Sequence, residues 1–429
     1  MAKLDTRSWR VAQSNDDCDG YGQHCAERSR RVSRKPTVML DVELRTTDDA
    51  SFGRGAAGDV GMDQNTLRRR GTGLLGVDSA RTAGGLTLYC PIAGPGDIFL
   101  VDIDGQVVHK WAAPAPPGRH AKLLKNGNLF YQGKGSTGHS LFPLWDVYHG
   151  GRLMELDADA VVIREVGHEL HHHDASIMAN GNLLVGAVER LSPGTAGRVV
   201  GGIPGSEAPD GSIWGDVVYE MTWDGEILWR WEPLDAFDPA ELPLDEHFSR
   251  EHWPMCNSVE EANDGNILLG YRSASTCVLV ERTSGKVMWR LGPEILAQQH
   301  HPHMLDNGHV LVFDNGSFRP SSSVPYSRVI EVDPADDNRI VWEYYDDPPQ
   351  NFYSPYMSNA QRLWNGNTLI SEGSFGRIFE VTPSGETVWD YVVPYFYSFP
   401  RGTGPESSSG AQNAIFRAYR YEASRFPWL

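Results

Sequence analysis

A short pattern recurs six times between residues 98 and 421, and it constrains the fold of this chain more than any other feature. Each copy joins an acidic or polar turn to a β-rich stretch, and most copies end on tryptophan. The copies span residues 102–111, 155–165, 220–229, 281–289, 331–342 and 380–389. Five are followed by a second tight turn, in which glycine comes after Asn126, Asn180, Asp264, Asn307 or Asn365. Asn-Gly and Asp-Gly between apolar runs are strong hairpin signals, because we expect both turn residues to adopt positive φ.

Two hairpins in each repeat predict four antiparallel strands in each repeat. The second turns recur at intervals of 43 to 84 residues. Repeats of this size and type are typical of the blades of a β-propeller, in which loops absorb the uneven spacing. The sequence therefore predicts an all-β protein, a six-bladed β-propeller.

The two ends of the repeat region predict how the ring closes. The first copy has no tight turn of the second kind before it, whereas the chain ends on one more β-rich stretch, residues 413–421, which we align with residues 359–364. We expect this last stretch to supply the inner strands of the blade whose outer strands lie near residues 98–111. The N- and C-terminal segments then close the ring within one blade and leave no open sheet edge.

Composition and charge limit the class of partner. Of the 429 residues, 40% are hydrophobic and 45 are glycine, which excludes a disordered or fibrous chain. The formal net charge is -18. Residues 1–80 hold 13 basic and 12 acidic residues, and the rest hold 25 and 44. Because this acidic excess repels phosphate groups, we expect neither nucleic acid nor a membrane as a partner.

The N-terminal region differs from the repeats. Residues 1–70 contain the basic run 29–35 and a Gly/Ala-rich stretch at 51–61. We expect an extension that packs on the propeller, residues 71–429, or on a neighbouring subunit, so the oligomeric state stays open and includes a homo-oligomer. There is no basic region followed by an apolar stretch and no run of 18 apolar residues, which favours a cytoplasmic protein. The odd number of cysteines, five, favours free thiols.

Polar residues gather at one place in the repeat, six and seven positions before each second turn. The pairs are Arg119-His120, His173-Asp174, Asn257-Ser258, His300-His301 and Ser358-Asn359. Inner strands of a propeller run along its axis, so these positions converge on one central pocket. Two histidine clusters, residues 171–173 and 300–303, fall here. Buried imidazoles need partners, and several together indicate a shared ligand.

The same positions carry a family resemblance that covers residues 71–429. The matching stretches are His172-His173-Asp174, residues 252–272 (HWPMCNSVEEANDGNILLGYR), residues 285–292 (GKVMWRLG) and residues 299–316 (QHHPHMLDNGHVLVFDNG). With these motifs the chain resembles the PAPS-independent arylsulfotransferases, which move a sulfuryl group from an aryl sulfate to a phenol. The resemblance implies a propeller enzyme with a small aromatic substrate and no required cofactor.

The resemblance also implies roles for individual residues. His300 is the expected nucleophile, which forms a sulfohistidine; His172 and His173 orient or deprotonate groups, and the fork of Arg272 suits a sulfuryl oxyanion. The family motif Trp-x-His-x-Asn-Ser reads here with Met255 in place of histidine, so Asn257 and the nearby His252 complete the catalytic candidates. The substrate-binding candidates are Arg119, His120, His301, His303, Tyr356 and Asn359.

Two other classes of function fit the same residues. His173, His300 and His252 are candidate ligands for a divalent metal, with Asp174 beside one of them, and such a site favours a lyase or hydrolase acting on an aromatic or carbohydrate-like substrate. The remaining alternative is a non-catalytic propeller that binds a partner on one face. Histidines along the axis argue against this last reading.

Overall fold

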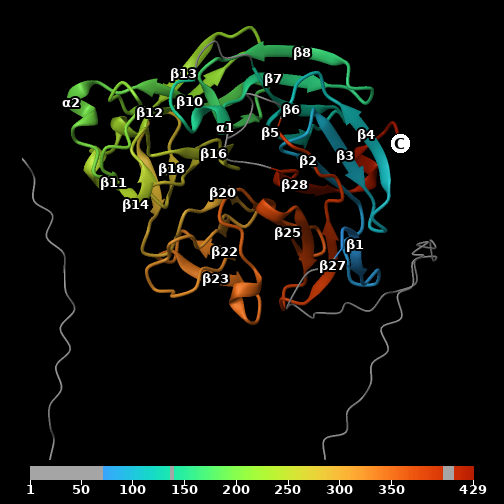
Figure 1. Ribbon diagram of the computed structural model, residues 1–429. Helices are drawn as coiled ribbons and strands as arrows, with labels where there is room; N and C mark the ends of the chain where they lie inside the picture. The colour runs from blue at the N-terminus through green and yellow to red at the C-terminus, as the bar shows by residue number, and fades with distance from the viewer. Residues whose placement is uncertain (1–70, 136–139, 400–409) are drawn as a thin grey trace, which may run out of the picture. The chain divides into compact units, whose positions relative to one another are not determined.

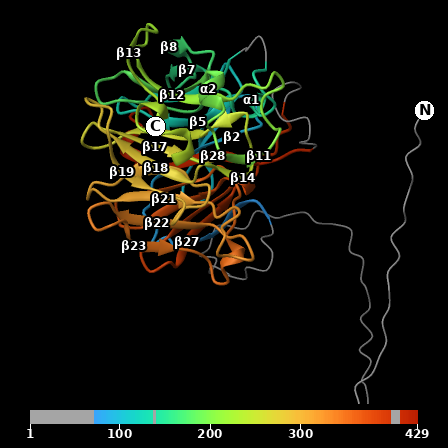
Figure 2. The ribbon, with the colours of Figure 1, turned by 90° about the vertical axis from the view of Figure 1, so that its left-hand side faces the viewer.

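Six small antiparallel sheets form a ring, as the repeats predict (Figure 1). The computed structural model describes residues 71–135, 140–399 and 410–429. The predicted extension, residues 1–70, lies outside the described residues, so its role and its boundary stay predictions. Figure 2 shows the ring from the side, with β7 and β8 at the top and β22, β23 and β27 at the bottom.

Each blade consists of four strands that follow one another from the axis outward. In the order of the chain the blades are β28-β2-β3-β4 (Ile415–Tyr421, Leu86–Pro91, Asp97–Val101, Val107–Ala112), β5 to β8 (Pro117–Leu123, Leu129–Lys134, Gly151–Leu156, Val162–Gly167), β9-β10-β12-β13 (His171–Ile177, Leu183–Arg190, Trp214–Met221, Ile227–Trp231), β16 to β19 (Cys256–Glu261, Ile267–Tyr271, Thr276–Val280, Val287–Leu291), β20 to β23 (His300–Met304, Val310–Asp314, Arg328–Asp333, Arg339–Tyr344) and β24 to β27 (Asn359–Arg362, Thr368–Glu372, Arg377–Val381, Thr387–Val392).

The structure also contains strands and helices beyond the four strands of each blade. Strand β1 (Gly73–Val77) pairs with β27 and gives the last blade a fifth strand. Strands β11 (Gly201–Ile203) and β14 (Leu244–Ser249) pair in parallel, and β15 (His252–Trp253) pairs with β12. The α-helices, α1 (Trp145–Tyr148) and α2 (Pro193–Ala196), are single turns. No helix in the described ranges is both long and apolar enough to cross a membrane.

The C-terminal strand β28 closes the ring, as predicted, by pairing with β2. The alignment that we expected for this strand is wrong by four residues. Ala418 pairs with Tyr89 in the way that Ala360 pairs with Ile370, so Arg417, and not Asn413, occupies the position of Asn359. The error matters for the site, because Arg417 then belongs to the axial column.

The recurring glutamate fixes the second hairpin in four repeats, at Glu155, Glu220, Glu331 and Glu380. Glu155 accepts hydrogen bonds from the side chains of Asn126 and Asn128, at 2.8 and 2.7 Å. Glu220 accepts equivalent bonds from Asn180 and Asn182, at 2.8 and 2.7 Å. Only the glycine of these turns has a positive φ, 85° at Gly127, so the expectation for both residues is wrong and the hairpin has a three-residue loop ending in a left-handed glycine.

The tryptophans that end the repeats link neighbouring blades. Their indole N–H groups donate to the turn of the following blade, in the pairs Trp111–Asp157, Trp289–Asn338, Trp342–Pro383 and Trp389–Ile103. In the third blade Trp231, and not the terminal Trp229, makes the equivalent bond, to Gly285. The Trp389–Ile103 pair, at 2.8 Å, joins the final blade to the first and completes the ring.

Replacing Trp389 by alanine is expected to lower the free energy of unfolding by about 3–5 kcal/mol, because the side chain is fully buried and leaves a cavity at the closing interface. Chemical denaturation of Trp389→Ala measures this loss. Trp364→Ala is the matched control, since Trp364 is 48% exposed, and we expect it to cost less than about 1.5 kcal/mol. Equal losses of unfolding free energy in the two variants would show that Trp389 at the closing interface stabilises the protein no more than an exposed tryptophan does.

Irregular backbone at the inner strands turns the polar column toward the axis. The pairing register shifts next to the column in β5, β9, β16 and β20. His173 and His301 adopt left-handed backbone, with φ of 51° and 49°. Bulges of this kind redirect side chains and concentrate near active sites, where the cost of strained backbone is offset by function.

Candidate active site

A cavity of about 320 Å³ opens where the first residues of three column pairs, Arg119, His173 and His300, meet the axis. Its polar lining includes Arg119, His173, Arg272, His300 and Tyr356. Apolar side chains form the rest of the wall, among them Ile92, Val147, Met255, Met357, Phe399 and Phe416. A mostly apolar pocket of this size with a few convergent polar groups is typical of a small-molecule site.

His300 is held in one orientation by hydrogen bonds on both ring nitrogens. Its Nδ1 lies 2.7 Å from Oδ1 of Asn315, whose amide nitrogen donates to the carbonyls of Ser354 and Met357. The asparagine oxygen therefore faces the ring, so Nδ1 carries the proton and Nε2 carries the lone pair. Nε2 accepts the backbone N–H of Met357 at 3.1 Å. Burial, and then the nearby charge of Arg272, hold the pKa of His300 well below its usual value.

His173 lines the cavity, and His172 lies behind it. The Nδ1 atoms of the two rings are 2.9 Å apart, and the ring of Tyr148 stacks on His173 with 4.2 Å between centroids. Burial, followed by the charge of Arg119, holds the pKa of His173 well below its usual value. Both cavity histidines are therefore neutral at pH 7 and offer lone pairs for chemistry.

Two arginines supply positive charge to the cavity, and neither pairs with a carboxylate among the described residues. Arg119 donates from Nη2 to the carbonyl of Val147, and its Nε has no acceptor within residues 71–135, 140–399 and 410–429. Nε of Arg272 also has no acceptor in the described structure. Burial lowers the pKa of Arg119 to about 9 and that of Arg272 to about 10, so both are protonated at neutral pH. Buried donors without acceptors indicate an anionic ligand.

The second residues of the column pairs form a buried polar layer next to the cavity lining. Asp174 accepts from Arg417 at 2.9 Å and lies 3.0 Å from Nε2 of His120. Its other bond, to the backbone N–H of Val259, ties it to the fourth blade. Although burial opposes the charge, Arg417 and then His120 hold the pKa of Asp174 well below its usual range. None of these second residues lines the cavity, so the layer supports it from beneath, although Nε of Arg417 and Nδ1 of His120 have no partner among the described residues.

A third cluster lies behind His172. Asp216 Oδ1 is 2.9 Å from Nε2 of His252 and 3.0 Å from Nε2 of His172, and all three side chains are fully buried. This is the one group in the described ranges whose donor set and spacing suit a metal ion. The expected ligands His173, His300 and His252 do not form such a group there, because His252 faces Asp216 and not the cavity.

The structure brings together only part of the candidate residues. His300, His173, Arg272, Arg119 and Tyr356 line the cavity, and His172 and His252 lie behind it. The others do not line it. Asn257 donates to the carbonyl of Gln299, Asn359 bonds both backbone groups of Ala418, His120 pairs with Asp174, and His301 lies against Tyr419 and His303.

Several residues of the site escape sequence reasoning. Arg417 is hidden by the shifted alignment of the last strand; Ala418, which corresponds to Ala121, Ala175 and Ala360 after three of the column pairs, is a signal that could have found it. Asn315 belongs to the quoted motif at residues 299–316 but had no assigned role. Asp216 and Tyr148 lie on β12 and α1, outside the column, and no periodic signal marks them.

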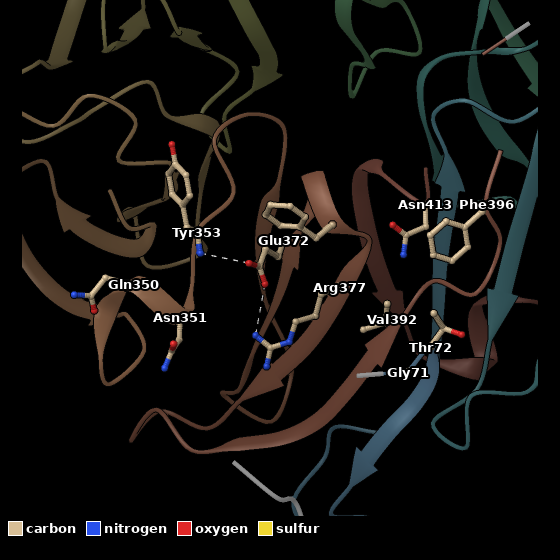
Figure 3. A pocket seen from close by; sticks show the side chains of 11 residues that line it. Gly71, Thr72, Gln350, Asn351, Tyr353, Glu372, Arg377, Val392, Phe396 and Asn413 are labelled. Carbon is tan, nitrogen blue, oxygen red and sulfur yellow. Dashed lines mark hydrogen bonds and ion pairs between the residues drawn. The ribbon is translucent and has the colours of Figure 1, made fainter. Parts of the chain in front are cut away.

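A second hollow of about 590 Å³ lies beside the last blade (Figure 3). Its charged groups are already paired, because Arg377 forms ion pairs with Asp390 and Glu372, and Glu372 accepts the backbone N–H of Tyr353. Phe396 lines this hollow, and Phe399 of the same segment lines the axial cavity. The axial cavity, with its unpaired guanidinium donors, is the better candidate for chemistry.

Comparison with known proteins gives one family match. A family model described as Arylsulfotransferase (ASST) matches residues 120–393. No curated protein matches the chain. Similar solved structures include a protein of unknown function from Bacteroides caccae (13% identity, TM-score 0.44, 78% of this chain and 98% of that one). They also include a streptogramin B lyase (12%, 0.41, 76% and 85%) and virginiamycin B lyase from Staphylococcus aureus (9%, 0.41, 74% and 89%).

Proposed function

Because the chain belongs to the arylsulfotransferase family, we propose that it transfers a sulfuryl group from an aryl sulfate to a phenol through a histidine of the axial cavity. The observation that carries the proposal is the lining of this cavity. Two guanidinium groups without carboxylate partners and a neutral imidazole held by Asn315 face the same 320 Å³ space. The cavity therefore suits a small anion attached to an aromatic ring.

In the first half-reaction the lone pair of His300 Nε2 attacks sulfur. The N–S bond forms, the S–O bond to the ring breaks, and the electron pair leaves with the phenolate. The N–H of Met357, which bonds Nε2 in the free protein, must give way, and it is then placed to donate to a sulfuryl oxygen. Arg272 and Arg119 offset the charge on the sulfuryl oxygens.

In the second half-reaction an acceptor phenol loses its proton to a base, and its oxygen attacks the sulfur of the sulfohistidine. The new S–O bond forms while the N–S bond breaks, which returns the lone pair to His300. Apolar walls such as Phe416 and Met357 contact the ring of the substrate. We propose a small aromatic molecule as both donor and acceptor, with no cofactor.

The test is a p-nitrophenyl sulfate assay with and without a phenol acceptor. Without acceptor, a stoichiometric burst of p-nitrophenol is expected, followed by slow hydrolysis; with acceptor, steady turnover with ping-pong kinetics is expected. Lack of both burst and turnover with a panel of aryl sulfates would refute the proposal. A metal-dependent lyase or hydrolase would instead lose its activity on chelation, and family membership favours the transferase.

The burst rate is expected to stay constant from about pH 8 to about pH 6. The neutral imidazole is the attacking form, and the lowered pKa of His300 keeps it neutral through this window, so the rate falls only at more acidic pH. Stopped-flow detection of p-nitrophenol at its isosbestic wavelength measures the profile. A pH profile of the burst rate with its midpoint at about 6.5, the pKa of a free imidazole, would contradict the assignment of His300 as the nucleophile.

A further inference from the structure

The carboxylate of Asp216 contacts three groups from different parts of the fold. Oδ1 is hydrogen-bonded to Nε2 of His252 at 2.9 Å and lies 3.0 Å from Nε2 of His172, where the orientation does not allow a hydrogen bond and the contact is electrostatic. Oδ2 accepts the backbone N–H of Cys256 at 2.8 Å. Although burial opposes the charge, His252 and then His172 lower the pKa of Asp216 to about 2. Asp216 is therefore a buried anion at neutral pH.

The carboxylate of Asp216 determines the tautomer of His172 and, through His172, that of His173. A ring nitrogen that faces a carboxylate oxygen at 3.0 Å is more stable as N–H than as a lone pair, so His172 carries its proton on Nε2. Burial lowers the pKa of His172, so the ring is neutral and Nδ1 is a lone pair. The Nδ1 of His173, 2.9 Å away, must then donate its proton. His173 keeps its lone pair on Nε2.

A second set of contacts, or second arm, runs from Asp216 through His252 and Tyr148 to the ring of His173. With its proton on Nε2, His252 accepts the hydroxyl of Tyr148 at Nδ1, at 3.0 Å. The ring of Tyr148 stacks on His173. Both arms therefore begin at Asp216 and end at His173.

We infer that Asp216 is a positioning residue, which acts through His172 and His252 to present His173 Nε2 to the cavity as the base that takes the proton of the acceptor phenol. This inference rests on the proposed sulfuryl transfer. No hydrogen bond to this atom exists within the described residues, whereas Nε2 of His300 is bonded to Met357. His300 is therefore the nucleophile that binds the sulfuryl group, and His173 is the base that takes the proton of the acceptor phenol.

The groups around His173 determine whether it can hold the proton. Burial opposes a positive charge on His173, and the charge of Arg119 opposes it as well. Tyr148 is protonated, because burial raises its pKa. Asp216 is the anion at the end of the His172 bridge, so its charge offsets the imidazolium that forms during the transfer. General-base catalysis of this kind contributes about 10²–10⁴-fold.

The same three groups have the donor set of a zinc site, and the distances decide between the two readings. Ligand atoms about 2.0–2.1 Å from a tetrahedral zinc lie about 3.3 Å apart. The observed 2.9 Å to His252 is a hydrogen-bond length, and the 3.0 Å to His172 is also shorter than the spacing of zinc ligands. A metal would bind the Nε2 lone pairs of His172 and His252. The role that we infer for Asp216 requires protons on those two atoms.

The variant Asp216→Asn tests the inference. When the amide oxygen of the variant keeps the bond from the N–H of Cys256, its NH2 group turns toward the imidazoles, which favours the opposite tautomers and leaves His173 Nε2 protonated. We expect an unchanged p-nitrophenol burst and a loss of about 10²-fold in transfer to phenol. Transfer to strongly acidic phenols, already ionised, is expected to stay near wild type. Asp245→Asn, which alters an exposed Asp–His pair, is the matched control with wild-type rates.

Three outcomes would overturn the inference. The first is an equal loss with weakly and strongly acidic phenols, the second a loss of the burst itself, and the third stoichiometric metal that disappears in Asp216→Asn. Failure of the proposed function differs from these, because wild-type protein would then show no sulfuryl transfer. If the variant does not fold, nitrogen-15 NMR of wild-type histidines decides the matter, with His173 predicted as the tautomer protonated on Nδ1 and an Nε2 proton contradicting it.

Discussion

Replacing His300 by alanine is expected to abolish the p-nitrophenol burst and to lower turnover by at least about 10³-fold. His300 Nε2 is the proposed atom that forms the bond to sulfur, so removal of the ring removes the nucleophile. The variant removes a buried ring bonded to Asn315 and Met357, so its thermal midpoint must be measured beside the kinetics. His247→Ala is the control, because His247 is an exposed histidine that stacks on Phe318.

The kinetic pattern separates the two cavity histidines. A folded His300→Ala protein that keeps a full burst would contradict the assignment of the nucleophile. His173→Ala should keep the burst and lose transfer to weakly acidic phenols. The reverse pattern, a burst lost in His173→Ala and kept in His300→Ala, would exchange the two roles.

Replacing Arg417 by methionine is expected to lower the free energy of unfolding by about 3–5 kcal/mol. The guanidinium is buried and bonds Asp174, His120 and the carbonyl of Asn257, so its loss leaves Asp174 as an uncompensated buried anion. These contacts join the closing strand β28 to three other blades. Arg417 therefore helps to hold the ring closed. Chemical denaturation measures the loss.

A second substitution tests the cause of this instability. If the stranded charge of Asp174 is responsible, Asp174→Asn in the Arg417→Met background should restore part of the loss, and the double-mutant cycle gives the coupling. Arg190→Met removes an exposed ion pair with Asp210 and should leave stability close to that of wild type. Arg417→Met with wild-type stability would show that the buried layer does not hold the ring.

The architecture could be predicted because turn chemistry and blade repeats are local signals. The Asn-Gly turns and the terminal tryptophans indicate six blades, and the structure confirms them together with closure by the last strand. The register of that strand could not be read in the same way. No tight turn follows β28, so nothing in the sequence anchored Arg417 to the column, and the alignment started from the wrong asparagine, Asn413.

The candidate site could be predicted only to the level of the column. Spacing before the turns brought Arg119, His173 and His300 to one cavity. It could not tell the cavity lining from the layer beneath, because the bulges in the inner strands decide which of two successive residues faces the cavity. Asp216 lies mid-strand in β12, and its contact with His252 depends on the excursion of β15 beside that strand.

The most direct measurement of the central claim is mass spectrometry of protein quenched after mixing with p-nitrophenyl sulfate and no acceptor. The account predicts one added sulfuryl group per chain, located on the peptide that contains His300 and lost when phenol is added before the quench. A sulfuryl group on another residue, or turnover without any covalent adduct, would contradict it.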